Sequence, residues 1–337
     1  MSEPGASPAL WGAQGLAALW MTSSQVLGDV RPASAISGFT RRPEVPLELL
    51  LLSAGVQLRT GHEGCFQSLR GILAAAVGMA IALLRHLRSD GAGVTWSKAV
   101  GCQLLLLPWW DPDGCPLPYS SVASALFAAL LAVTCSSLER GLLTLDRQGR
   151  LWQFALLVWF AALIPSGYIF LFSAVTPAAR ELVWTWPLAQ LVDILLGACV
   201  VGKPFASWQG GAADVLCLIL VLVLLLPIES LQGFQAAKLG SLGLALTLGS
   251  AGVSLLARFL AHPALVGLGK TSWEAIFLCG PLLEMCGQYL GPNFQRSAPG
   301  FLAFNFCLWT LASNLATGLR LCIHKASSDR FRTSACE

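Results

Sequence analysis

Charged residues are scarce in this chain. Asp, Glu, Lys and Arg make up only 12% of its 337 residues, whereas an ordinary soluble domain carries about 25%. This deficit argues against a soluble protein, because little charge is left to cover a surface in water. In its place the sequence has 55% hydrophobic residues and a mean hydropathy of +0.67, which predicts an integral membrane protein.

Clustered metal ligands are also missing from the sequence. The 11 cysteines are scattered without a C-x-x-C pair, and none stands with His at the spacing of a zinc site. The basic residues form no continuous stripe, so a nucleic-acid partner is not expected. The sequence therefore predicts no metal site, no cofactor and no nucleic-acid interface, and it leaves the oligomeric state open.

Apolar segments recur along the whole length of the chain. A bilayer core requires about 20 helical residues, so the second and the fourth segments are too short to cross it alone. The pattern predicts an all-α, multi-pass transmembrane helical bundle of about 10–11 helices within residues 1–323. A short polar tail at residues 324–337 is expected to be disordered. The eleven segments lie at 9–27, 46–57, 71–87, 97–110, 119–138, 151–173, 181–202, 212–228, 239–261, 272–290 and 300–323.

Lysine and arginine are distributed unevenly between the loops. If the eleven segments alternate across the bilayer, sixteen of the 21 basic residues fall on one side and five on the other. Loops rich in Lys and Arg stay in the cytosol, so this bias places the C-terminus there. The sixteen are Arg31, Arg41, Arg42, Arg85, Arg88, Lys98, Arg140, Arg147, Arg150, Lys203, Arg258, Lys270, Arg320, Lys325, Arg330 and Arg332.

One apolar segment opens with a polar cluster. The stretch from His262 to Leu283 reads HPALVGLGKTSWEAIFLCGPLL, and its first polar residues can lie among lipid headgroups at little cost. Glu274 stands one turn further in, where a carboxylate is costly unless it is paired, hydrated or protonated. One interpretation is a polar cavity lined by Glu274 and Glu284. The other is that Glu274 reaches back to the interface while Glu284 faces a neighbouring helix.

The same stretch resembles a late helix of the acyltransferase 3 family, multi-pass proteins whose corresponding segment reads LGxISYxxYLxHxP. The matching positions are Gly269, Ser272, Trp273, Ile276, Phe277, Leu278 and Pro281. Four further blocks resemble the family in the same order along the chain. They are QGLAALWMTSSQ from Gln14, ISGF from Ile36 with the basic residues that follow it, LLLLPWWDPDGCPLPYSSVAS from Leu104, and WPLAQLVDILLGACVVG from Trp186.

The resemblance implies a chemistry and a set of site residues. Members of the family transfer an acyl group from acyl-CoA or a lipid donor to a hydroxyl, often on a carbohydrate or a lipid, with a His as general base. Acyl-CoA would then be a substrate and the lipid bilayer the solvent of the protein. The positions that correspond to the family's motifs, Tyr119, Ser120, Asp193 and Ser272, are expected to line a substrate cavity together with Glu274, which is a candidate because of its place inside an apolar segment.

Four family positions carry other residues here. Gln14 stands in place of the Arg, Gln25 in place of the base His, and Ser124 in place of the Glu of the third block. Cys279 replaces the late His. An amide cannot accept a proton at neutral pH, so Gln25 can bind a hydroxyl but cannot activate it as His does.

Three functions therefore stay open. The chain can be an acyltransferase that uses another base, for which His62 beside Glu63 is the candidate. It can be a catalytically inactive member that binds a lipid or an acyl donor as a scaffold. A transporter is the third possibility, but no inverted repeat with matching helix breaks is found in the sequence.

Overall fold

A computed structural model describes the chain at residues 8–27, 44–60, 136–172, 187–200, 211–224, 240, 242–243, 255–290 and 297–334. Every element in these ranges is an α-helix, which confirms the all-α class for this part of the chain. The helices are α1 (Pro8–Leu27), α3 (Glu44–Thr60), α7 (Ser136–Arg147), α8 (Leu151–Phe172), α10 (Pro187–Val200), α11 (Gly211–Leu224), α13 (Leu255–Leu260), α14 (Pro263–Lys270), α15 (Ser272–Leu290) and α17 (Ala298–Ser334).

Seven predicted segments each coincide with one of these helices. The segment at 239–261 is described only at 240, 242–243 and 255–261, where the short α13 lies, and the segment at 119–138 is described only at 136–138, the start of α7. The boundaries of α15 agree with the predicted segment at both ends, and α1 begins one residue earlier than expected. The predicted segments at 71–87 and 97–110 lie outside the described residues. The seven segments are 9–27, 46–57, 151–173, 181–202, 212–228, 272–290 and 300–323.

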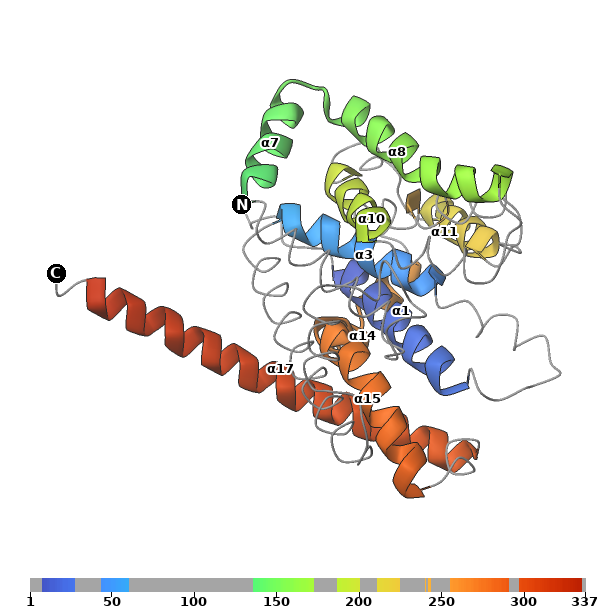
Figure 1. The fold of residues 1–337 in the computed structure, drawn as a ribbon, viewed down its shortest axis with the longest axis vertical. Helices are drawn as coiled ribbons and strands as arrows, with labels where there is room; N and C mark the ends of the chain where they lie inside the picture. Colours follow the sequence, from blue (N-terminus) through green and yellow to red (C-terminus); the bar gives the residue numbers. More distant parts are fainter. Residues whose placement is uncertain are drawn as a thin grey trace, which may run out of the picture.

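The helices pack in a succession of neighbours. Helix α8 lies on α10, α10 lies on α3, and α3 lies on α1. On its other side α1 contacts α13, α14 and α15, and α15 contacts α17. Figure 1 shows this succession from α8 at the top to α17 at the bottom. The first helix of the chain is therefore central, and it touches elements that are more than 200 residues away in the sequence.

Glycines allow a close helix crossing between α3 and α10. A Cβ added at Gly55 would overlap the carbonyl oxygen of Ile194, and one added at Gly197 would overlap the carbonyl oxygen of Leu52. Each glycine thus leaves room for a backbone carbonyl of the other helix. Small residues of this kind allow helix backbones to touch, which maximises van der Waals contact where no hydrophobic driving force exists between helices.

A second glycine crossing joins α1 to the α13–α14 segment. A Cβ at Gly12 would overlap the carbonyl oxygen of Leu260, and one at Gly269 would overlap the carbonyl oxygen of Trp11. Gly269 is buried at the end of α14, because the polar stretch before α15 forms a helix of its own that packs on α1.

Side-chain caps fix the ends of α13 and α14. The carboxylate of Asp214, in the first turn of α11, accepts hydrogen bonds from the backbone N–H groups of Leu255 and Leu256, both at 2.9 Å. His262 caps α14, since its Nδ1 accepts a hydrogen bond from the backbone N–H of Ala264 at 3.3 Å. Both caps satisfy donors that a helix start leaves without intrahelical partners.

Helix α17 is the longest described element, with 37 residues. Its stretch Pro299–Cys322 is the single candidate membrane span that the described residues contain. Disorder was expected from His324 onward, but α17 continues without a break to Ser334. The expectation was wrong because a helix that is already formed adds residues at little entropic cost, one hydrogen bond for each residue fixed. Figure 1 shows this end of α17 projecting away from the other helices.

The glycine crossing at α14 makes a testable prediction. Gly269→Ala should lower the free energy of unfolding in detergent by about 2–3 kcal/mol, because its methyl group must displace the α1 backbone. Gly267→Ala in the same helix is the matched control, since a Cβ there meets nothing within 4 Å. The control should be neutral or more stable by up to about 1 kcal/mol. Equal thermal unfolding temperatures for the two variants would contradict the close contact between Gly269 and the α1 backbone.

Candidate functional site

Both of the α1 motif residues lie on one face of that helix. Gln14 is completely buried, and Gln25 is partly buried near the C-terminal end of the same helix. They are eleven residues apart, which is close to three full turns. The structure thus keeps the relative placement that an Arg and a His would have on this helix, with amides in both positions.

Three carboxylates lie in the interior of the helix succession. Glu48 of α3, Asp193 of α10 and Glu274 of α15 are 2%, 5% and 1% exposed. Asp193 and Glu274 were both predicted as cavity residues from their place in apolar segments. Glu48 was missed, although the signal was the same, because its segment was judged too short to span a bilayer. Acids placed in this way are rare in membrane interiors and are usually functional.

Several buried hydroxyls are accounted for by the backbone of their own helix. Thr22 donates to the carbonyl oxygen of Leu19 at 3.1 Å, and Ser53 donates to that of Leu49 at 2.6 Å. Ser24 donates in the same way to Met21 at 2.7 Å. These residues are helix-bonded polar groups of the interior and need no ligand to satisfy them.

Ser272 differs from the other hydroxyls. It is completely buried, and its Oγ has no hydrogen-bond partner among the described residues. A buried hydroxyl in this state is costly unless a water or a substrate group reaches it. Ser272 is therefore the described residue that fits a substrate-binding position best.

Ser272 and Glu274 do not share a face of α15. Two residues apart on a helix, they lie about 200° from each other around its axis. The Ser272 side is also the side of Cys279, whose Sγ donates to the carbonyl oxygen of Thr22 on α1 at 3.8 Å. Cys279, in the position of the family's late His, is thus a helix-contact residue. Ser272 and Glu274 therefore do not line the same wall of a cavity.

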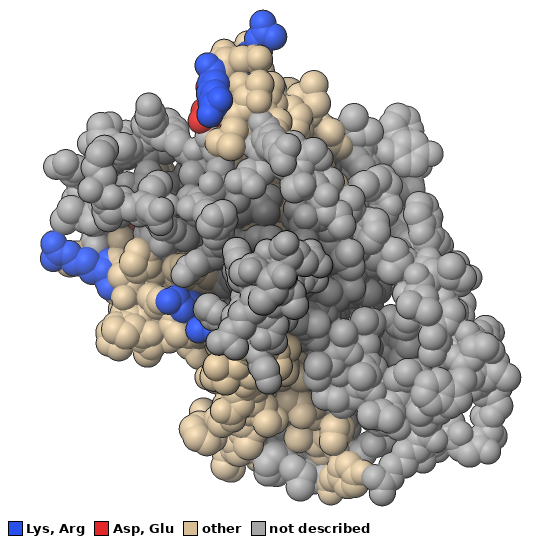
Figure 2. Space-filling model, turned by 90° about the vertical axis from the view of Figure 1, so that its left-hand side faces the viewer, with Lys and Arg blue, Asp and Glu red and all other residues tan. Residues whose placement is uncertain are grey.

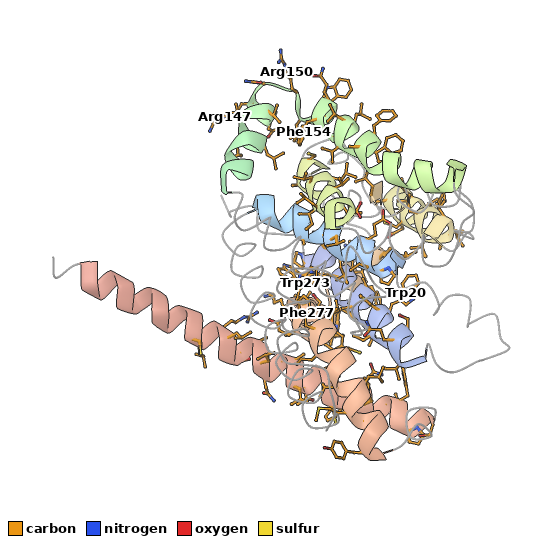
Figure 3. The ribbon with its side chains drawn as sticks, in the orientation of Figure 1. Trp20, Arg147, Arg150, Phe154, Trp273 and Phe277 are labelled. Carbon is orange, nitrogen blue, oxygen red and sulfur yellow. The ribbon has the colours of Figure 1, made fainter. Side chains whose placement is uncertain are left out.

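Aromatic residues surround the start of α15. The rings of Trp273 and Phe277 are stacked, with centroids 6.1 Å apart and an interplanar angle of 24°. Figure 3 shows the pair in the middle of the molecule, with Trp20 of α1 on the other side of the same region. Glu274, next to Trp273 in the first turn of α15, is only 1% exposed.

The remaining predicted site residues lie outside the described residues. They are Tyr119, Ser120, Ser124 and His62. The side chain of Glu284 is also outside the described part, so a polar cavity lined by Glu274 and Glu284 stays a prediction. Within the described ranges, no three side chains of His, Cys, Asp or Glu are grouped so as to hold a metal ion.

The outer surface of the described helices is largely apolar. In Figure 2 the charged atoms are few and separated, and the described surface between them is neutral. Arg147 and Arg150, at the turn between α7 and α8, point away from the other helices (Figure 3). The exposed large apolar residues lie mainly on α8, α11 and α17, among them Trp152, Leu157, Phe160, Leu218, Leu222, Leu302, Phe306 and Leu321.

Comparisons of the chain with protein-family models, with curated proteins and with solved structures find no match. The resemblance to the acyltransferase 3 family therefore rests on the five sequence blocks described above.

Replacing Ser272 by Ala tests whether a water or a ligand binds its hydroxyl. If nothing binds its hydroxyl, Ser272→Ala should leave the free energy of unfolding unchanged or raise it by about 1 kcal/mol, since a buried group without a partner is removed. Ser53→Ala is the matched control and should cost about 0.5–1 kcal/mol, because a made hydrogen bond is lost. A clear loss of stability in Ser272→Ala would instead show that a bound water or ligand satisfies Ser272.

Proposed function

We propose that this chain is a multi-pass membrane protein of the acyltransferase 3 type, which transfers an acyl group from acyl-CoA or a lipid donor to a hydroxyl of a carbohydrate or lipid. One observation carries the proposal: three buried carboxylates lie inside a bundle whose outer helices expose large apolar side chains. Buried acids together with an exposed apolar surface fit a polar site enclosed by a lipid-facing shell.

Helix lengths support more than one crossing of the bilayer. Pro299–Cys322 of α17 has 24 residues, or about 36 Å at the usual rise of a helix, against a hydrocarbon core of about 30 Å. Helices α1, α8 and α15 have 20, 22 and 19 residues, which correspond to about 28–33 Å. In water the exposed apolar side chains of α8 and α11 would be unfavourable, whereas lipid chains accommodate them.

A buried carboxylate can supply the base that the family motif has lost. Glu274 belongs to the block that resembles the family's late helix and is shielded from water. In the proposed step the acceptor hydroxyl oxygen attacks the acyl carbonyl carbon and its proton passes to Glu274. The bond between the acyl carbon and the sulfur of CoA breaks, and the released thiolate takes up a proton.

The second candidate is an inactive family member that binds the acyl donor without transferring it. Gln14 and Gln25 favour this function, because amides occupy one face of α1 where the family has Arg and His. An amide retains hydrogen bonding to a substrate but loses proton transfer, which contributes a factor of about 100–10,000 to the rate.

Turnover and binding must be measured separately to test the proposal. Purified protein in nanodiscs is incubated with radiolabelled acyl-CoA, and hydrolysis, transfer and binding are followed. Wild-type protein should turn over the label, and Glu274→Gln should reduce turnover by a factor of about 100 or more while binding persists. Asp146→Asn is the control, because Asp146 is an exposed acid in α7, and it should leave turnover unchanged.

Further variants separate the alternatives. Loss of turnover in His62→Ala but not in Glu274→Gln would assign the base to His62. Binding without turnover, with turnover gained by the triple variant Gln14→Arg, Gln25→His and Ser124→Glu, would establish the inactive binding protein. If neither the wild-type protein nor the triple variant binds acyl-CoA, the resemblance to the family is overturned.

A further inference from the structure

Two polar atoms on the inner face of α17 lack partners. Oδ1 of Asn305 and Nε1 of Trp309 are buried and have no hydrogen-bond partner among the described residues. Asn305 is only 9% exposed. Its Nδ2 donates to the carbonyl oxygen of Phe301 at 3.0 Å, and this bond fixes which end of the amide is the oxygen. Asn305 therefore presents an acceptor, and Trp309 presents a donor.

The two atoms are complementary and belong to neighbouring positions. Asn305 and Trp309 are four residues apart, so they stand on the same side of α17 with their Cβ atoms about 6 Å apart. A hydroxyl group, of water or of an alcohol, can donate to Asn305 and accept from Trp309 at once. An ether or a carbonyl oxygen can only accept, so it would satisfy Trp309 and leave Asn305 without a partner.

The surroundings indicate what carries the hydroxyl. The buried residues next to the pair, Phe304, Leu308 and Ala312, form an apolar cluster with α15. Trp309 is half-buried and marks the edge of this cluster. Beside it on the outer surface lie Leu302 and Phe306, which are 67% and 74% exposed. A molecule that reaches the pair therefore presents a hydroxyl at one end and an apolar body to these side chains.

The depth of the pair in the candidate span points to a molecule dissolved in the bilayer. Asn305 and Trp309 follow the start of the span, Pro299, by about 9 and 15 Å along the helix. Water and charged headgroups do not compete for hydrogen bonds inside the hydrocarbon layer. We propose that Asn305 and Trp309 bind the hydroxyl of a membrane lipid alcohol, such as a sterol, a diacylglycerol or a long-chain alcohol, at the edge between α15 and α17. The proposal rests on the membrane embedding proposed above and not on acyl transfer.

Photolabelling with matched probes tests this site. Full-length protein in phosphatidylcholine nanodiscs is labelled with a long-chain alcohol that carries a diazirine, and separately with the O-methyl ether of the same probe. The alcohol should label α17 peptides saturably, and the ether should bind at least about fivefold more weakly, as expected for one lost hydrogen bond. Asn305→Leu and Trp309→Phe should each weaken labelling by the alcohol to a similar extent.

The control variant is Thr310→Val. Thr310 is exposed on another side of α17, and its Oγ1 donates to the carbonyl oxygen of Phe306 at 2.8 Å, so labelling should not change. Asn305→Leu removes a buried acceptor without a partner and should fold, which size-exclusion chromatography and thermal unfolding verify. Equal labelling by alcohol and ether, or labelling that survives Asn305→Leu, overturns the site. Absence of labelling also overturns it, with a structural water as the occupant.

Acyl-CoA turnover measured on the same nanodiscs distinguishes failure of the alcohol site from failure of acyl transfer. Turnover that persists while the alcohol probe fails to label overturns the alcohol site alone. Labelling that persists while acyl-CoA is neither bound nor turned over overturns acyl transfer alone. Failure of the protein to enter nanodiscs would overturn the membrane embedding on which both depend.

Discussion

Backbone-to-backbone contact at glycines is the constraint on which the described fold depends. Gly55 and Gly197 bring α3 against α10, and Gly12 and Gly269 bring α1 against the α13–α14 segment. Such contacts hold helices together through the van der Waals packing of their backbones. The two crossings therefore fix two of the neighbour contacts in the succession, α3 with α10 and α1 with the α13–α14 segment.

The two crossings also decide where polar groups can go. They draw α1, α3, α10 and α15 together so closely that Gln14, Glu48, Asp193 and Glu274 are enclosed. A carboxylate in that position costs free energy in every unliganded molecule, and it is retained only when interactions or a function repay the cost. Asp214 shows the structural alternative, since both of its carboxylate oxygens cap the start of α13.

Helix α17 is built differently from the central helices. It packs on α15 along one face, while Leu302, Phe306 and Leu321 remain exposed. Helix α17 thus packs on its neighbour along one face and exposes large apolar side chains on another. Asn305 and Trp309 lie between the face of α17 that packs on α15 and the exposed apolar face.

The sequence by itself determined the helical class, the placement of seven apolar helices, and the two buried acids Asp193 and Glu274. These follow from hydropathy and helix period, which are local properties. Tertiary structure alone decided that Gly269 is a helix contact, that Glu48 is enclosed, and that Ser272 and Glu274 face apart. It also decided that Asn305 and Trp309 lack partners. The reason is that hydropathy ranks residues by their own chemistry, whereas enclosure and hydrogen bonding depend on which distant helix packs on each face.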